Sequence, residues 1–233
     1  MTRWKYVRPI LAGLAILAVG LLPWTFLAQW NRQVRPELPW AAVLTVAYLV
    51  VLVGWLHGFG PPSATAAARR WSLRLAPHDI HERPEGLSSA ALIALLMLLY
   101  VAWILMSRLS PLPDLTAYPT TAYRWSMFLM GGIMAGLVEE VAFRGYMQTG
   151  LERIDPHSAV WITSLVFVLS HVTQGVGAVV LLGPGLFVAS MLFGTLAQRT
   201  GSIAPGIAIH ILGDLSRAFF GVLRGDVDLL FAS

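Results

Sequence analysis

Residues 125–150 read WSMFLMGGIMAGLVEEVAFRGYMQTG, a long apolar run that contains Glu139, Glu140 and Arg144. An apolar run of ~20 residues is long enough for a helix to cross a lipid bilayer. A charged side chain at the centre of such a helix costs roughly 2.5–3.5 kcal/mol, so it is rare unless it faces a protein interior. The stretch therefore predicts a membrane helix whose charged side chains face the inside of a bundle and have a function there.

The composition of the whole chain extends this prediction. Of the 233 residues, 57% are hydrophobic and 12% are charged, whereas soluble domains carry about 25% charged residues. We expect an all-α fold, a polytopic transmembrane helix bundle of about seven spans (six to eight), built as a single integral membrane domain over residues 1–233. The expected spans lie near residues 7–30, 40–60, 88–110, 125–150, 158–174, 177–198 and 203–223.

The charge distribution predicts an orientation rather than a polar partner. The net charge is +4, but the basic residues lie in loops and at the N-terminus, so nucleic acid is not expected as a partner. The loops on the N-terminal side of the bundle carry more arginine and lysine than the opposite loops, which predicts a cytoplasmic N-terminus. The arginine-rich, lysine-poor chain suggests a bacterium and therefore its inner membrane. The chain has no cysteine, which excludes disulfides and thiolate chemistry.

The first group of polar residues is Glu139-Glu140-Val-Ala-Phe-Arg144. Glu140 and Arg144 are four residues apart, so on a helix they share one face and can pair. Glu139 lies about 100° around the helix and has different neighbours. We expect the paired carboxylate to be structural and the free one to act as a general base. The alternative is that all three side chains form a buried ion network that holds the bundle together.

The second group is Phe167-Val-Leu-Ser-His171, in which the phenyl ring can wall one side of the imidazole. Glu139 and His171 lie at similar distances from the short turn near Ile154 to His157. At ~1.5 Å per residue, the two antiparallel helices would bring this carboxylate and this imidazole to similar depth. A lone membrane histidine also serves as a hydrogen-bonding group between helices, which is the alternative here.

The third group is His210-Ile-Leu-Gly-Asp214, with the same four-residue spacing. Asp214 can orient the imidazole, as carboxylates do for catalytic and metal-bound histidines. Arg217 lies three residues further on and can neutralise the same carboxylate. Taken alone, this pair is equally consistent with a hydrogen-bonded contact between helices.

The three groups together resemble the CAAX protease and bacteriocin-processing family of intramembrane endopeptidases. Its signature is EExxxR, then FxxxH, then HxxxN or a similar polar residue, and the order and spacing are intact here. The resemblance covers roughly residues 125–220, which we expect to be the catalytic core. It implies a helical bundle with a water-accessible cavity, and a hydrolase that cleaves a membrane-associated protein or peptide.

The resemblance also implies a role for each residue. Glu139 and His171 would activate the attacking water, and His210 together with the residue at position 214 would steady the developing oxyanion. Position 214 is aspartate where the family commonly has asparagine, and an ionised carboxylate cannot donate a hydrogen bond to an oxyanion. Asp214 would then be protonated, orient His210 or bind a metal. The supporting residues would be Glu140, Arg144 and Phe167.

The resemblance leaves two mechanisms, with and without metal. The three acids outnumber Arg144, and a buried surplus of negative charge requires a cation or a bound proton. Two histidines and a carboxylate suit catalytic Zn²⁺, and the ligands would be His171, His210 and Glu139. The HExxH spacing of soluble zinc proteases is absent. We therefore expect a glutamate-type hydrolase without a cofactor, with zinc as the alternative.

Two other classes of function share these residue types. Intramembrane acids and histidines also form the proton relays of transporters, although the internal repeats common in transporters are absent. A non-catalytic membrane binding protein, such as one that confers immunity to a bacteriocin, is the second alternative. For an enzyme, the candidate reactions are CAAX-type cleavage, leader-peptide processing and removal of a C-terminal sorting signal.

Overall fold

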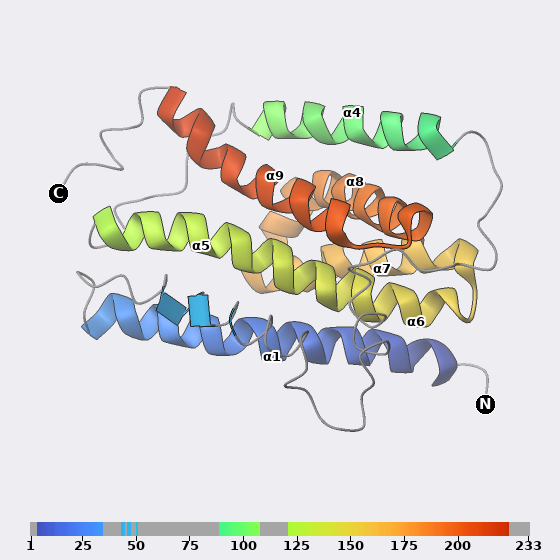
Figure 1. Cartoon of the computed structure of the whole chain (residues 1–233), viewed down its shortest axis with the longest axis horizontal. Coiled ribbons are helices and arrows are strands. Elements are labelled where there is room, and N and C mark those ends of the chain that lie inside the picture. The colour runs from blue at the N-terminus through green and yellow to red at the C-terminus, as the bar shows by residue number, and fades with distance from the viewer. Residues whose placement is uncertain are drawn as a thin grey trace.

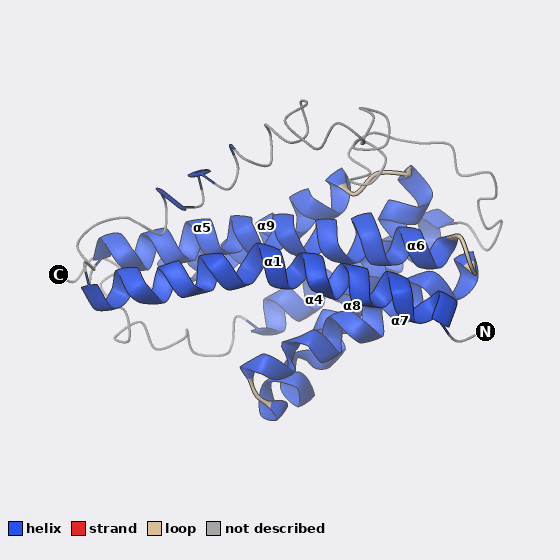
Figure 2. Cartoon of the chain, turned by 90° about the horizontal axis from the view of Figure 1, so that it is seen from below, coloured by secondary structure: helices blue, strands red, loops and turns tan. Residues whose placement is uncertain are grey.

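The computed structural model describes residues 4–34, 89–107 and 121–223, together with a few positions between 43 and 50. Within these ranges the regular structure is helical and contains no strand (Figure 2), which confirms the all-α prediction. The helices are α1 (Trp4–Val34), α4 (Ser89–Ser107), α5 (Thr121–Glu140), the π-helix η3 (Val141–Gln148), α6 (Thr149–Glu152), α7 (Pro156–Ser170), the 3₁₀-helix η4 (His171–Gln174), α8 (Val176–Thr200) and α9 (Ala204–Leu223).

Each expected span that falls in the described ranges corresponds to helix, and the expected span at 40–60 lies almost entirely outside them. The span expected at 125–150 is a succession of α5, η3 and α6, because the backbone widens into a π-helix directly after Glu140. Among the described residues, one helical segment, Trp4–Asn31, is both long enough and apolar enough to cross a bilayer. Ala91–Ala102 and Pro156–Ser170 are shorter apolar helices. The number of seven spans stays a prediction.

The ends of the helices follow from local sequence. Asp155 caps α7, where its carboxylate accepts a hydrogen bond of 3.0 Å from the backbone N–H of His157, and Pro156 occupies the first turn. Helix α8 ends at a glycine cap: Gly201 has a φ of 69°, which is in the left-handed region and favours glycine. Gly175, with a φ of 104°, separates η4 from α8 and so ends the 3₁₀-helix that begins at His171.

Helix α8 lies at the centre of the bundle, where it packs against α4, α7 and α9. Helix α1 runs beside α5 and η3 (Figure 1), and the N-terminal part of α1 reaches α6. A Cβ added at Gly150 would lie 2.7 Å from Cβ of Pro9, so only glycine permits this approach. The start of α1 and the turn between α6 and α7 therefore lie at the same end of the molecule.

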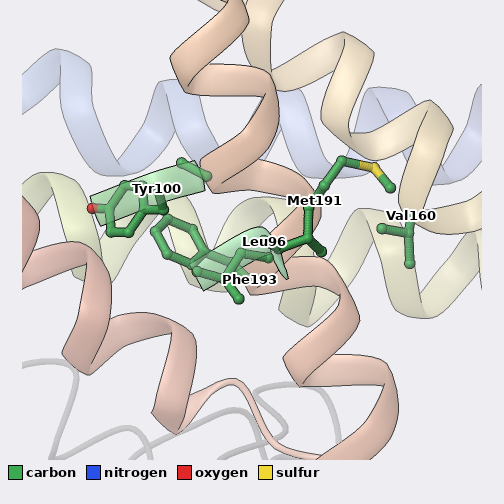
Figure 3. Packing of buried hydrophobic residues seen from close by; sticks show 7 residues of the cluster. Leu96, Tyr100, Val160, Met191 and Phe193 are labelled. Carbon is green, nitrogen blue, oxygen red and sulfur yellow. The ribbon is translucent and has the colours of Figure 1, made fainter. Parts of the chain in front are cut away.

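Two apolar clusters hold these helices together. The first joins α4, α7 and α8 (Figure 3) and consists of Leu96, Tyr100, Val160, Ala189, Met191, Leu192 and Phe193. The second joins η3, α6 and α7 under the cover of α1 and consists of Ala142, Phe143, Met147, Leu151, Ala159 and Phe167.

The outer faces of the bundle are apolar and its interior contains charge. Val19 of α1, Trp161 of α7 and Leu212 of α9 are more than half exposed, whereas Glu140 and Arg144 are fully buried. Contiguous exposed apolar surface is rare on soluble monomers and marks contact with a partner or a membrane. This inverted distribution is what a helix bundle surrounded by lipid requires.

Candidate active site

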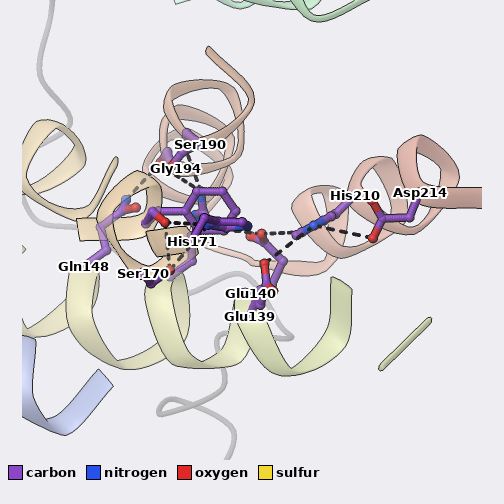
Figure 4. Close-up of polar contacts among 11 residues, drawn as sticks. Glu139, Glu140, Gln148, Ser170, His171, Ser190, Gly194, His210 and Asp214 are labelled. Atoms are coloured by element: carbon purple, nitrogen blue, oxygen red, sulfur yellow. Dashed lines mark hydrogen bonds and ion pairs between the residues drawn. The ribbon is translucent and has the colours of Figure 1, made fainter. Parts of the chain in front are cut away.

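The three polar groups of the sequence meet at one place in the fold (Figure 4). The first comes from the junction of α5 and η3, the second from the junction of α7 and η4, and the third from the middle of α9. Contacts with Phe167 connect all three, since its ring centroid lies 4.9 Å from that of His171, 6.2 Å from that of His210 and 4.9 Å from Cζ of Arg144.

Glu140 and Arg144 form the ion pair that their spacing predicts. Nη1 of Arg144 donates a hydrogen bond of 2.9 Å to Oε1 of Glu140, and both side chains have 0% exposure. Nη2 donates to Oγ of Ser190 at 2.7 Å and to the carbonyl oxygen of Ser190 at 3.0 Å. The guanidinium also lies 5.4 Å from the ring centroid of Phe193. Cation–π contacts of this kind and charge-assisted hydrogen bonds offset the cost of burying the charge.

His171 has a defined tautomer, because its ring is held by a carbonyl group. Its Nδ1 lies 2.8 Å from the backbone carbonyl oxygen of Phe167. A carbonyl oxygen can only accept, so Nδ1 carries the hydrogen and donates it. In the neutral ring the lone pair is then on Nε2, the nitrogen available to a water or a substrate.

The ring of His210 is held by Glu140. Its Nδ1 lies 3.0 Å from Oε1 of Glu140, the same oxygen that accepts from Arg144. Phe193 stacks on the imidazole with the ring centroids 5.1 Å apart and the planes inclined by 23°. The hydrogen bond that orients this ring thus comes from Glu140, across 70 residues of sequence. Asp214, four residues away, contributes an oxygen 3.8 Å from Nε2, beyond hydrogen-bonding distance.

Glu139 and Asp214 occupy the accessible side of the site. Oε2 of Glu139 lies 3.8 Å from Nε2 of His210, and Glu139 also interacts electrostatically with His171. Its side chain has 14% exposure, that of Asp214 has 41%, and that of the adjacent Glu140 has 0%. The two neighbouring glutamates therefore differ as their position around the helix predicts, one enclosed and one reachable.

Sequence reasoning missed several residues that complete the site. Ser190 accepts from Arg144, and Gln148 donates to the carbonyl oxygen of Gly194 at 2.9 Å. Gln148 could have been found, because it continues the four-residue spacing of Glu140 and Arg144. Ser190 and Gly194 are also four apart, but their contacts with η3 span 46 residues and leave no local signal.

The residues expected to bind zinc do not form a metal site as they lie here. In the described part of the chain, no three His, Asp or Glu side chains are arranged to hold one ion. Each of the two histidines uses Nδ1 in a hydrogen bond, His171 with Phe167 and His210 with Glu140, which leaves Nε2 of each ring for a water, a substrate or a metal. The reaction without a cofactor stays a prediction.

Comparison with known proteins finds one family model that matches part of the chain. Residues 121–216 match the family described as type II CAAX prenyl endopeptidase Rce1-like. The searches of curated proteins and of solved structures found no match. The matched segment runs from the start of α5 to Ser216 in α9 and contains all three polar groups, whereas α1 and α4 precede it. This domain implies an integral membrane protease of CAAX type that acts on a membrane-associated protein or peptide. Residues 121–216 are thus similar to the Rce1-like type II CAAX prenyl endopeptidase family, in agreement with the resemblance of the three motifs.

Proposed function

We propose that the protein is an intramembrane endopeptidase in which Glu139 and His171 activate the attacking water. The observation that carries the proposal is the contrast between the two adjacent glutamates. Oε1 of the fully buried Glu140 accepts from Arg144 and lies 3.0 Å from Nδ1 of His210, whereas the partly exposed Glu139 approaches His210 only to 3.8 Å, beyond hydrogen-bonding distance. A general base needs a carboxylate that can take a proton from water, as the partly exposed Glu139 can and the enclosed Glu140 cannot.

In the proposed reaction, a water donates one hydrogen bond to the Glu139 carboxylate and one to Nε2 of His171. Glu139 takes the proton as the water oxygen attacks the carbonyl carbon of the scissile peptide bond. The same proton then passes from Glu139 to the leaving amine nitrogen when the C–N bond breaks. The fixed tautomer of His171 supports this role, because it leaves a lone pair on Nε2.

His210 is the proposed stabiliser of the tetrahedral intermediate. Three carboxylates lie within 4 Å of its ring nitrogens: those of Glu139, Glu140 and Asp214. As an imidazolium it would donate from Nδ1 to Glu140 and from Nε2 to the oxyanion. Asp214 would then act through its negative charge on His210, a role that an aspartate can fill and that needs no hydrogen bond from position 214.

We propose a bundle of about seven spans in a bacterial inner membrane, with the N-terminus in the cytoplasm. The shared end of α1 and the α6–α7 turn supports this orientation, because both would then lie on the arginine-rich side. The cysteine-free chain makes the test direct. A His157→Cys variant should react with a membrane-impermeant maleimide only after cells are opened, and Gln33→Cys, at the other end of α1, should react in intact spheroplasts. The reverse pattern would refute this orientation.

The substrate we propose is a membrane-associated peptide, with leader-peptide processing, CAAX-type cleavage and removal of a C-terminal sorting signal as the candidates. The test compares the peptide termini in membranes of cells that produce the natural protein or Glu139→Gln. We expect termini that appear only with the natural protein, at rates reduced by about 10²–10⁴ in the variant. Equal peptide termini, with both proteins folded and inserted, would favour a non-catalytic immunity protein. Solute uptake by purified protein in liposomes would favour a transporter.

A further inference from the structure

Helix α4 brings one tyrosine into the interior of the bundle, although α4 precedes the segment that matches the family. Tyr100 is 4% exposed and lies in the cluster formed with α8 (Figure 3). Most of α4 faces outward with apolar side chains such as Leu98. A phenol in such a helix costs more to bury than phenylalanine unless its hydroxyl group serves a purpose.

The ring of Tyr100 supports the ring that stacks on His210. Its edge meets Phe193 at a centroid distance of 5.6 Å and an interplanar angle of 79°. Phe193 in turn lies over His210 at 5.1 Å and 23°. Edge-to-face aromatic pairs have a preferred geometry, so Tyr100 restricts the tilt of Phe193 and thereby the plane of the imidazole.

The hydroxyl group of Tyr100 abuts α9 within one turn of His210. A Cβ added at Gly213 would collide with this oxygen, and Cζ of the same ring would lie 3.1 Å away. Gly213 therefore has to be glycine for the hydroxyl group to reach the α9 backbone between His210 and Asp214. One tyrosine thus contacts both supports of the imidazole, the stacking ring and the helix that carries it.

We propose that Tyr100 is a positioning residue for His210, so that a helix outside the family domain completes the site. The kinetic consequence rests on the proposed function, and the structural consequence does not. Misplacing a catalytic group by ~1 Å can cost about 10²-fold in rate. We expect Tyr100→Leu, which removes the edge-to-face ring, to lower kcat about 10–100-fold, and Tyr100→Phe to lower it several-fold, on the order of 3–10. KM should change little in both.

The first test uses the contact with Gly213. Gly213→Ala should lower kcat for an internally quenched prenylated CAAX peptide in proteoliposomes, because the methyl group meets the hydroxyl oxygen. The double variant Tyr100→Phe/Gly213→Ala should recover part of that loss, since the oxygen is gone and only the contact with Cζ remains. A double variant no better than Gly213→Ala would overturn the proposal.

The second test needs no cleavage, so it separates this proposal from the proposed function. In histidine-labelled protein, the ring nitrogen resonances of His210, assigned with His210→Gln, should shift in Tyr100→Leu while those of His171 stay. Met191→Ala, which removes packing on the Val160 side of the same cluster (Figure 3), is the control and should leave both unchanged. An unchanged His210 resonance in Tyr100→Leu would overturn the proposal. A shifted resonance in a protein that cleaves nothing would overturn only the proposed function.

Discussion

Two regions of the site begin at adjacent residues, Glu140 and Glu139, and hold their charged groups in opposite ways. The closed region consists of Glu140, Arg144, Gln148 and Ser190, all with 0% exposure and joined to one another or to neighbouring backbone by hydrogen bonds of 2.7–3.0 Å. The open region consists of Glu139, the Nε2 edge of His210 and Asp214, separated by 3.8 Å and partly exposed.

The contrast shows how a helix bundle can contain several neighbouring charges. In the closed region each charge has a counter-charge and hydrogen bonds, which offset the cost of removing it from water. Groups held in this way cannot easily exchange protons with a substrate. The open region keeps its groups beyond direct hydrogen-bonding distance of one another and partly exposed, so that they can still hydrogen-bond to a water or a substrate. We interpret the closed region as support and the open region as the reactive side.

The largest expected effect comes from breaking the closed region. Arg144→Met leaves the Glu140 carboxylate buried without its guanidinium partner, so the free energy of unfolding should fall by about 3–5 kcal/mol. The measurement is the SDS fraction at which tryptophan fluorescence changes in mixed micelles. The double variant Glu140→Leu/Arg144→Met removes both charges and should recover most of the loss. An unchanged midpoint in the single variant would contradict the interpretation of this region.

A smaller effect is expected where α9 presses on the closed region. A Cβ added at Gly206 would lie 2.9 Å from Oε2 of Glu140 and 3.5 Å from Cβ of Phe193. Gly206→Ala should therefore lower the free energy of unfolding by about 1–3 kcal/mol and reduce cleavage, because α9 must move with His210. Gly177→Ala is the matched control, since a Cβ there meets nothing within 4 Å. Equal unfolding midpoints for both variants would argue against tight packing at Gly206.

A substitution in the open region should change the rate of cleavage rather than the free energy of unfolding. Asp214→Asn keeps the shape of the side chain and removes the charge 3.8 Å from Nε2 of His210. We expect a rate about tenfold lower, equivalent to ~1.4 kcal/mol in the barrier, with the unfolding midpoint within about 0.5 kcal/mol of the natural protein. A rate equal to or above that of the natural protein would indicate that an amide at this position serves the reaction better than the charge does.

The smallest effect is expected at an acid outside both regions. Hydrogen bonds from the Ser158 hydroxyl group and the His157 backbone hold the pKa of Asp155 below its ordinary value of 3.8. A depressed pKa in the folded state means that the cap contributes stability above pH 3.8, and that this is lost as the pH falls through the lower, folded value. Asp155→Asn should shift the melting temperature by about 2 °C or less at pH 7. In this variant the melting temperature should also fall less steeply at acid pH than in the natural protein. An equally steep fall would mean that other groups cause the loss of stability at acid pH.

Prediction from sequence succeeded where the controlling interactions are local. The helices α4, α7, α8 and α9 lie where the sequence predicts spans, because runs of apolar residues there are bounded by Pro, Gly and capping residues. The pair Glu140–Arg144 follows from the four-residue spacing. The π-helix after Glu140 had no counterpart in the prediction, since nothing in Val141–Gln148 departs from the pattern of an α-helix.

The amino-acid sequence alone was enough to predict the helices of the described residues, the three apolar segments that contain buried charges, and the resemblance to the CAAX protease family. These properties depend on composition and on spacings within one helix, where the backbone geometry is known in advance. Contacts between helices are visible only in the tertiary structure. There Glu140 orients His210 and Ser190 accepts hydrogen bonds from Arg144. The ring of Phe193 stacks on the imidazole, and Tyr100 packs against Phe193. Those contacts join residues of different helices, from Phe193 and His210 within the matched segment to Tyr100 in a helix that precedes it. These contacts depend on how whole helix faces pack against each other, which the spacing of residues along one helix does not predict.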